Sequence, residues 1–371
     1  MHKSILALVV LTSALGCVAA VQQYQQETAG RVASEAHRGA LIEQFAVALE
    51  DYFLFPEIGR RYAAARRTKA AAGGYASYAR AASFAEAVTR DLQQVHPDGH
   101  LRLRAPVSGQ RGGVAGGGNA EDASAETGIE KAAWLADGIA YLGLELFPGT
   151  DASLAALRAA LERHASARTL VIDLRTHGGG YTEEIDLLSA YLFAEPTVLV
   201  HMETRAVMDR GKPDTATVKR VEAPPGLLRQ AHIAVPGEQA TALRSARVYV
   251  LTSGYTGSAA EHLALALKRT GRATLIGETT AGAGHYGKIV ELPGGFPAFI
   301  PVGRTFDPDT GDGWEGTGVA PHHQVPAERA LYEALTRSGL PAAEARQISS
   351  RTRPRESMER IVPLRKPAAS G

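Results

Sequence analysis

The sequence predicts an α/β protein with a mainly parallel sheet, preceded by a small N-terminal helical bundle. Apolar runs that alternate with helical patterns in the C-terminal part of the chain carry this prediction. Strands and helices that alternate in this way form parallel sheets, because each helix returns the chain across the sheet by a right-handed crossover. The chain has 371 residues, of which 45% are hydrophobic. That is enough for a large core and a smaller second domain.

The N-terminal helical domain is predicted over residues 35–105. Apolar side chains recur at helical spacing from Leu41 to Leu49 and again from Phe84 to Leu92. Pro56 ends the first of these helices, because proline has no amide hydrogen for the helical ladder. Several short helices that bury one apolar face each indicate a bundle.

The larger domain is predicted over residues 129–340. The run from Leu170 to Leu174 has the pattern of a strand buried on both faces. Three further strands and three helices alternate around it. We predict strands at 138–144, 248–252 and 273–276, and helices at 153–167, 183–193 and 259–269.

Residues 1–20 have the features of an export signal. A basic start is followed by an apolar stretch, and Val18-Ala19-Ala20 resembles a small-residue cleavage site. The stretch is shorter than the roughly 20 residues that span a bilayer. We therefore expect an exported protein of the periplasm or cell envelope, with an uncleaved anchor as the alternative.

Cys17 is the only cysteine. The sequence Ala14-Leu15-Gly16-Cys17 resembles a lipoprotein cleavage box, although Ala14 and Leu15 fit its first two positions poorly. Attachment to a membrane through a lipid on Cys17 is thus a second form of the exported protein. Cleavage before Val21 would remove the cysteine, and with it disulfides, thiol catalysis and cysteine-ligated metals.

Two segments are predicted to hold no regular structure. The first is a glycine-rich linker over 106–128, which lacks apolar periodicity. The second is the tail, 348–371, which is rich in basic residues and in proline and glycine.

The charge balance argues against nucleic acid as a partner, and the histidine spacing argues against a bound metal. The 40 Lys and Arg balance 39 Asp and Glu, and no basic stripe carries interleaved aromatic residues. Nucleic acid is therefore not expected as a partner. Histidines 96, 322 and 323 match no metal-ligand spacing, so we expect no metal and no other cofactor.

Three turns carry residues suited to chemistry. After the strand that ends at Leu174, Gly178-Gly179-Gly180 expose amide groups that could hold a phosphate or an oxyanion; a simple turn is the alternative. Ser258 begins a helix, where its hydroxyl is either an N-cap or a nucleophile above the helix dipole. Thr256 and Ala260 exclude the G-x-S-x-G elbow of α/β-hydrolases. The third turn contains His100, which taken alone is more often a structural residue than a base.

Six short motifs follow one another along the chain: Asp51–Pro56, Asp98–Arg102, Asp173–Gly180, Thr256–Glu261, Gly277–Gly282 and Glu315–Pro321. In this order they resemble the tail-specific (C-terminal-processing) serine proteases, in the branch that includes interphotoreceptor retinoid-binding protein and the tricorn core protease. The resemblance extends from about residue 45 to 326. It implies a core with the fold shared by Clp protease and crotonase. No PDZ domain is expected, because the stretch between Leu103 and Ile139 is too short for one.

The resemblance also implies a catalytic site. In one arrangement of the family a lysine serves the nucleophile, but Ala283 stands at that position here and Lys288 lies five residues later. In the tricorn-like arrangement the matching residues are Ser258 as nucleophile, His100 as base and Glu315 as the residue that orients or polarises the site.

Two departures from the family pattern accompany this assignment. Gly99 replaces the serine that precedes the tricorn-like histidine, and His177 replaces the usual asparagine of the glycine-rich turn. The oxyanion hole implied by the resemblance consists of the N–H groups of Gly179 or Gly180 and of Ala259.

The function implied is that of a serine endopeptidase that acts on exported or envelope polypeptides through an acyl-enzyme on Ser258. A protein that carries hydrophobic ligands on the same core, without catalysis, is the alternative. Acyl-CoA chemistry on a crotonase-type core is a third reading, which the family-specific motifs disfavour.

Overall fold

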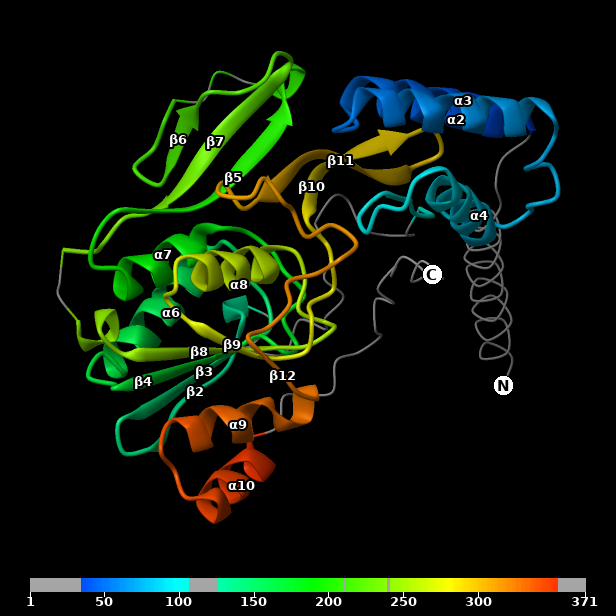
Figure 1. Ribbon diagram of the computed structural model, residues 1–371. Helices are drawn as coiled ribbons and strands as arrows, with labels where there is room; N and C mark the ends of the chain where they lie inside the picture. Colours follow the sequence, from blue (N-terminus) through cyan, green and yellow to red (C-terminus); the bar gives the residue numbers. More distant parts are fainter. Residues whose placement is uncertain (1–34, 107–125, 210, 212, 239–240, 353–371) are drawn as a thin grey trace, which may run out of the picture. The chain divides into compact units, whose positions relative to one another are not determined.

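The computed structural model describes residues 35–106, 126–209, 211, 213–238 and 241–352. They divide into two compact units, drawn in Figure 1. The helical unit comprises the described residues of 35–96, 101–106 and 288–300. The α/β unit comprises those of 97–100, 126–287 and 301–352.

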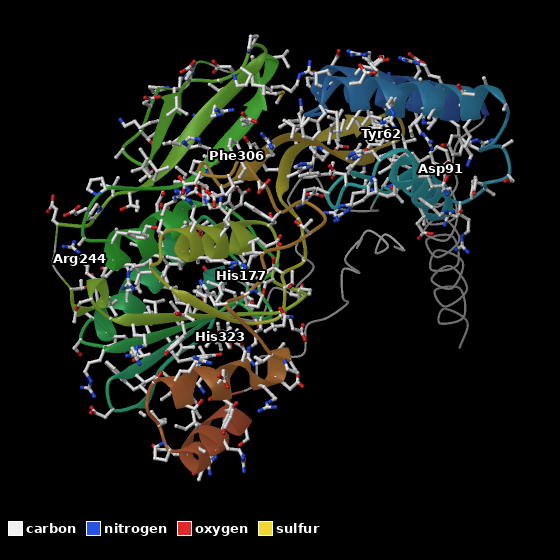
Figure 2. The ribbon with its side chains drawn as sticks, viewed as in Figure 1. Tyr62, Asp91, His177, Arg244, Phe306 and His323 are labelled. Atoms are coloured by element: carbon white, nitrogen blue, oxygen red, sulfur yellow. The ribbon has the colours of Figure 1, made fainter. Side chains whose placement is uncertain are left out.

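The helical unit contains the expected helices, α2 (Glu35–Tyr52), α3 (Pro56–Ala71) and α4 (Ala81–Val95). Pro56 does not end α2, which already stops at Tyr52; it is the first residue of α3. At that position the missing amide hydrogen of proline costs nothing, because the first N–H groups of a helix have no partner within the helix. Aromatic rings fill the core, and Phe53 meets Tyr62 edge to face with centroids 5.0 Å apart. Tyr62 is labelled in Figure 2.

A distant hairpin completes this core. Strands β10 (His285–Leu292) and β11 (Phe296–Phe306) pair, and β1 (Arg102–Leu103) pairs with β11 through Phe299 and Ala298. Leu292 and Phe296 are buried in the same apolar cluster as the helices. The sequence-based boundaries placed residues 288–300 in the larger domain, whereas they pack with the N-terminal helices.

The main sheet of the α/β unit has the strand order β12-β9-β8-β4-β3-β2. All neighbours are parallel except β2 and β3, so the prediction of a mainly parallel sheet is confirmed. The strands are β2 (Ile129–Ala136), β3 (Ile139–Leu144), β4 (Thr169–Asp173), β8 (Arg247–Thr252), β9 (Thr274–Gly277) and β12 (His323–Gln324).

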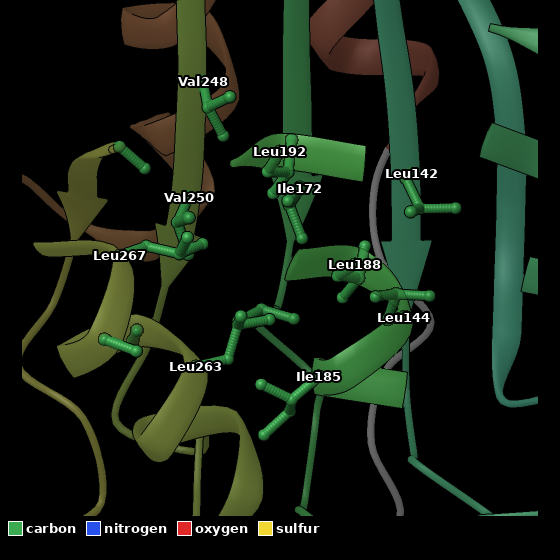
Figure 3. Packing of buried hydrophobic residues seen from close by; sticks show 14 of the residues in the cluster. Leu142, Leu144, Ile172, Ile185, Leu188, Leu192, Val248, Val250, Leu263 and Leu267 are labelled. Carbon is green, nitrogen blue, oxygen red and sulfur yellow. The ribbon is translucent and has the colours of Figure 1, made fainter. Parts of the chain in front are cut away.

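Helices cover both faces of this sheet (Figure 1). Helices α6 (Asp151–Arg163), α7 (Glu183–Leu192) and α8 (Ala259–Arg269) pack on one face, and α9 (Ala330–Arg337) and α10 (Ala342–Arg351) on the other. Alternate residues of each strand point to opposite faces of the sheet. Ile172 packs toward α7 and α8, as Figure 3 shows, and Val171 packs toward α9 on the other face.

A second, antiparallel sheet in the α/β unit is not predicted from the sequence. It joins β5 (Thr197–Arg205), β6 (Val218–Val221) and β7 (Leu227–Ala234) to residues 303–306 at the end of β11. Most residues of β6 are exposed and most residues of β7 are only partly buried, so neither strand has the continuous apolar run of a core strand. Three short 3₁₀ turns connect the unit, at Ala206–Met208, Ala242–Arg244 and Ala327–Arg329.

Several predictions fall on the ends of the chain and the linker. The signal segment with Cys17, residues 107–125 of the linker and residues 353–371 of the tail lie outside the described residues. Residues 348–351, which the prediction assigned to the tail, instead form the end of α10, and Ile348 packs against the cluster of α9. In the described ranges, no helix is both long and apolar enough to cross a membrane, and no separate PDZ domain is present.

Candidate active site

Three turns meet at one edge of the main sheet. They follow β4, β8 and β9, which are parallel neighbours and therefore end on the same side. Backbone hydrogen bonds join them: the Gly257 N–H donates to the His177 carbonyl at 3.0 Å, and the Ala281 N–H to the Thr256 carbonyl at 2.9 Å. The fold thus brings the glycine-rich turn, the Ser258 turn and the residue 278–284 turn together.

Ser258 has a strained backbone. It lies at the N-cap of α8 with φ 54° and ψ −119°, and it alone among the described non-glycine residues has a positive φ. Such a conformation costs on the order of 1–3 kcal/mol and persists only where the surroundings impose it. An ordinary serine N-cap has an extended backbone. A sharp, strained turn from a strand into a helix is the way a nucleophilic serine is exposed in α/β-hydrolases.

Glu261 holds Ser258 in this conformation. Its fully buried carboxylate accepts hydrogen bonds from the N–H of Ser258 at 2.9 Å and of Ala283 at 2.8 Å. The other oxygen accepts the Gly282 N–H at 2.7 Å and the Thr280 hydroxyl at 2.5 Å. Burial raises the pKa of Glu261 to about 7, and the four donors oppose this shift. One carboxylate therefore fixes the serine to the turn that follows β9.

The predicted oxyanion donors occupy different environments. Gly179 lies against Ser258: a Cβ on it would be 2.7 Å from the Ser258 Cβ, and its φ of +114° also requires glycine. The Gly179 N–H donates to Nδ1 of His177 at 3.1 Å. Gly180 and Ala259 line the same cavity as Ser258. The Gly179 N–H is thus engaged by His177, whereas Gly180 and Ala259 lie at the cavity.

His177 is a structural residue of the glycine-rich turn. It is fully buried inside the α/β unit (Figure 2), and its ring packs edge-on against Phe147 with centroids 4.1 Å apart. Burial lowers its pKa to about 3, so the ring is neutral. An asparagine side chain would accept the same N–H two residues ahead. This explains how histidine can stand where the family usually has asparagine.

His177→Asn is expected to weaken the acid sensitivity of the fold. The unfolded chain takes up a proton on this histidine below pH 6.5, whereas the folded chain does so only near pH 3. Stability is therefore lost as pH falls below 6.5, by about 2 kcal/mol at pH 5. Urea unfolding at pH 7.5 and pH 5 measures the loss of unfolding free energy between the two pH values. This loss should be about 2 kcal/mol smaller in the variant than in the wild type. Equal losses in the two proteins would mean that His177 is not held neutral.

A cavity of about 320 Å³ opens beside Ser258, entirely within the α/β unit. Its lining includes Gly180, Met202, Ser258, Ala259, His262 and His285. Two histidines therefore face the same space as the serine, while His100 is not among the lining residues.

Glu315 lies beside the turn of His100 but contacts its main chain. The carboxylate accepts hydrogen bonds from the N–H groups of Gly99 at 2.5 Å, Gly284 at 2.7 Å and His285 at 2.9 Å. A Cβ on Gly99 would approach this carboxylate to 3.1 Å, so the serine of the tricorn-like pattern would crowd it. The His100 N–H donates to Asp98 at 2.9 Å. Predicted residues Glu315 and His100 are thus neighbours.

Sequence reasoning missed the pair formed by Asp98 and His285. The Asp98 carboxylate, with a side chain 0% exposed, lies 2.7 Å from Nδ1 of His285. Burial by itself would lower the pKa of His285, but the hydrogen bond and charge of Asp98 prevail and raise it. Burial and the charge of Asp98 also raise the pKa of Glu315. The pair spans 187 positions in sequence, and no local motif could have revealed it.

Sequence reasoning also missed a row of hydrogen-bonded side chains that leads from His262, in the cavity, through His232 to Asp186. Nε2 of His262 lies 2.8 Å from Nδ1 of His232, and Nε2 of His232 lies 2.6 Å from the partly exposed Asp186. Burial and the neighbouring His232 lower the pKa of His262 well below its usual value. The spacing of Ser258 and His262, one helical turn apart, was the available signal.

The donor atoms of Asp98, His285 and Glu315 lie within 4.8 Å of one another, which is a spacing that a metal ion could use. Their present contacts fit hydrogen bonding better. The Glu315 carboxylate accepts hydrogen bonds from three backbone N–H groups, and Nδ1 of His285 is hydrogen-bonded to Asp98. The donor set therefore acts as a polar network of the protein itself.

The chain belongs to peptidase family S41, whose model matches residues 138–325. The family resemblance drawn from its motifs is thereby confirmed. A lipoprotein from Streptococcus agalactiae shares the fold: it is 16% identical, with a TM-score of 0.52 over 83% of this chain and 98% of its own.

Two further solved structures match a smaller share of this chain. The photosystem II D1 C-terminal processing protease is 24% identical, with a TM-score of 0.38, and the match covers 51% of this chain and 43% of that one. The tricorn protease is 19% identical, with a TM-score of 0.34, over 57% of this chain and 18% of its own. This chain thus spans less than half of the length of either protease.

Proposed function

We propose that this peptidase cuts exported or envelope polypeptides internally through an acyl-enzyme on Ser258. The strained backbone of Ser258 is the observation that carries the proposal. A buried carboxylate and a glycine packed against the serine impose this strain, and a helix cap alone would not need it.

The surroundings of Ser258 support acyl transfer. Attack of its hydroxyl on a peptide carbonyl would place the oxyanion near the N–H groups of Ala259, at the start of α8, and of Gly180. Each such donor contributes on the order of 3 kcal/mol to the transition state. Gly179 could contribute only if its N–H left His177.

The proton of Ser258 requires a base, and the family resemblance gives that role to His100 with Glu315 as its partner. In support of this assignment, Glu315 lies against the Asp98–His100 turn.

Export through the N-terminal signal, with or without a lipid on Cys17, is part of the same proposal. Mass-spectrometric sequencing of the native N-terminus tests it; an intact Met1 would contradict export.

Incubation with reduced, unfolded casein tests the function. The wild-type chain should generate new peptide termini within the casein sequence, identified by mass spectrometry, and Ser258→Ala should generate none. A carrier of hydrophobic ligands would leave casein intact in both samples. Cleavage confined to the C-terminal end of casein would contradict endopeptidase action.

A further inference from the structure

We infer that His262 is a specificity-determining residue of the pocket beside Ser258. It selects an uncharged side chain that donates a hydrogen bond, on the substrate residue whose carbonyl Ser258 attacks. This inference rests on the proposed function, since it names the substrate class of the same nucleophile. It leaves the choice of base unchanged.

His262 lies one helical turn beyond Ser258 on α8. Its backbone N–H donates to the Ser258 carbonyl at 3.0 Å. Residues four positions apart lie on the same face of a helix, and helical side chains lean toward the N-terminus, which is the Ser258 end of α8. Both residues line the cavity of about 320 Å³. A side chain one bond from a carbonyl bound at Ser258 would therefore enter the space that His262 borders.

Two further side chains fix which nitrogen of His262 carries the proton. Nε2 of His232, on β7, lies 2.6 Å from the carboxylate of Asp186 on α7, and a carboxylate accepts the proton of that nitrogen. In the neutral form of His232 the lone pair is then on Nδ1, which lies 2.8 Å from Nε2 of His262. His262 accordingly donates through Nε2 and keeps its own lone pair on Nδ1.

This lone pair is available to a bound side chain. Nδ1 of His262 has no hydrogen-bond partner among the described residues. The residue is only 4% exposed, and burial together with the neighbouring His232 lowers its pKa well below the usual value, so the ring is a neutral acceptor. An unpaired buried acceptor is unfavourable. The pocket therefore favours a side chain that donates a hydrogen bond over an apolar side chain of the same shape.

Much of the remaining lining is apolar or already paired. Met202, Ala259 and Trp314 contribute apolar surface to the cavity. The hydroxyl groups of Thr204 and Tyr286, which also line it, are hydrogen-bonded to each other. A mainly apolar pocket with a buried acceptor suits a side chain with an apolar body and a hydroxyl or amide end, such as threonine, tyrosine or glutamine.

A cationic side chain fits this pocket less well. Glu183 places a carboxylate in the lining, but the residue is exposed, and exposed ion pairs contribute little. An ammonium or guanidinium group beside His262 would lose its water to a neutral ring that offers one lone pair. The uncharged donors are therefore the expected class.

A pair of isosteric peptides tests the inference. One peptide that the wild-type chain cuts in casein is resynthesised with threonine or valine as the residue before the cut. We expect kcat/KM to be about tenfold higher for threonine, which is the scale of one hydrogen bond. His262→Leu should lose this preference. Gln230→Leu changes another polar side chain of the lining and should keep it.

Asp186→Asn tests the row of side chains from outside the pocket. Asp186 is not among the described residues that line the cavity, and its side chain is 32% exposed. An asparagine can offer His232 either its N–H₂ group or its carbonyl oxygen, so the proton on His262 is no longer assigned to Nε2. The preference for threonine should fall severalfold. In the wild type, the nitrogen-15 chemical shifts of labelled histidine should show the proton of His262 on Nε2.

Equal rates for threonine and valine in the wild type would overturn the inference and leave Ser258 as the nucleophile. A threonine preference that survives in folded His262→Leu, or a proton on Nδ1 of His262 in the wild type, would overturn it as well. If His262→Leu does not fold, Asp186→Asn decides, because an unchanged preference there overturns the inference. Hydrolysis by Ser258→Ala at the wild-type rate, or casein left intact by the wild type, would instead reject the proposed function and the inference with it.

Discussion

Ser258→Ala is expected to lower kcat on the order of 10⁴-fold or more while leaving the fold intact. The substitution removes the attacking oxygen and changes no buried contact of the backbone N–H with Glu261. Loss of the N-cap side chain should cost only about 1 kcal/mol of stability. Initial rates on one peptide, with the melting temperature as control, measure both effects. A rate unchanged by the substitution would show that the serine is only a cap.

Ser258→Gly provides a matched control that separates strain from chemistry. Glycine adopts φ 54° and ψ −119° without a Cβ clash, whereas alanine keeps the clash. We expect the glycine variant to be inactive but more stable than the alanine variant by about 1 kcal/mol. Equal stability of the two variants would mean that the backbone of Ser258 is not strained.

Glu261→Gln should have the largest effect on stability, a loss of about 3 kcal/mol or more, together with a large fall in kcat. Both carboxylate oxygens accept two hydrogen bonds each. An amide nitrogen in place of one oxygen would face two donors and leave them unsatisfied in a fully buried site. The Ser258 turn and the residue 280–283 turn would then separate. Denaturant unfolding and peptide kinetics measure the two losses.

Glu184→Gln is the control for Glu261→Gln. Glu184 is also buried, but only one of its oxygens accepts hydrogen bonds, from Gly149 and Ser153, and the other has no partner among the described residues. A glutamine can keep those two bonds through its own carbonyl oxygen. A similar loss in both variants would show that any buried charge matters equally, and would contradict a special role for Glu261.

The core of the fold was predictable because its signals are local. Strands such as β4 are buried along their whole length and read as apolar runs, and each is followed within a short distance by an amphipathic helix. The antiparallel sheet was not predictable in this way, since β7 has polar and apolar residues that are both partly buried. The hairpin of 288–300 packs with helices far earlier in the chain, α4 (Ala81–Val95) among them, and periodicity carries no information on such a contact.

The site was predictable only in part, for a similar reason. Ser258 could be located because the turn and the start of the helix are both visible in the neighbouring sequence. Its positive φ, in contrast, results from contacts with Glu261 and with Gly179 on another turn. The contacts of Asp98 with His285 and of Glu315 with Gly99 join residues 187 and 216 positions apart. A family motif can name such residues, and only the folded chain shows which of them touch.

Labelling with a serine-reactive phosphonate tests the central claim most directly. The phosphonate forms a stable bond with an activated nucleophile, and peptide mapping by mass spectrometry identifies the residue that carries it. We predict a single adduct, on Ser258, that is lost in Ser258→Ala. An adduct on another residue, or continued hydrolysis of casein by protein whose Ser258 is fully labelled, would contradict the assignment of Ser258 as the nucleophile.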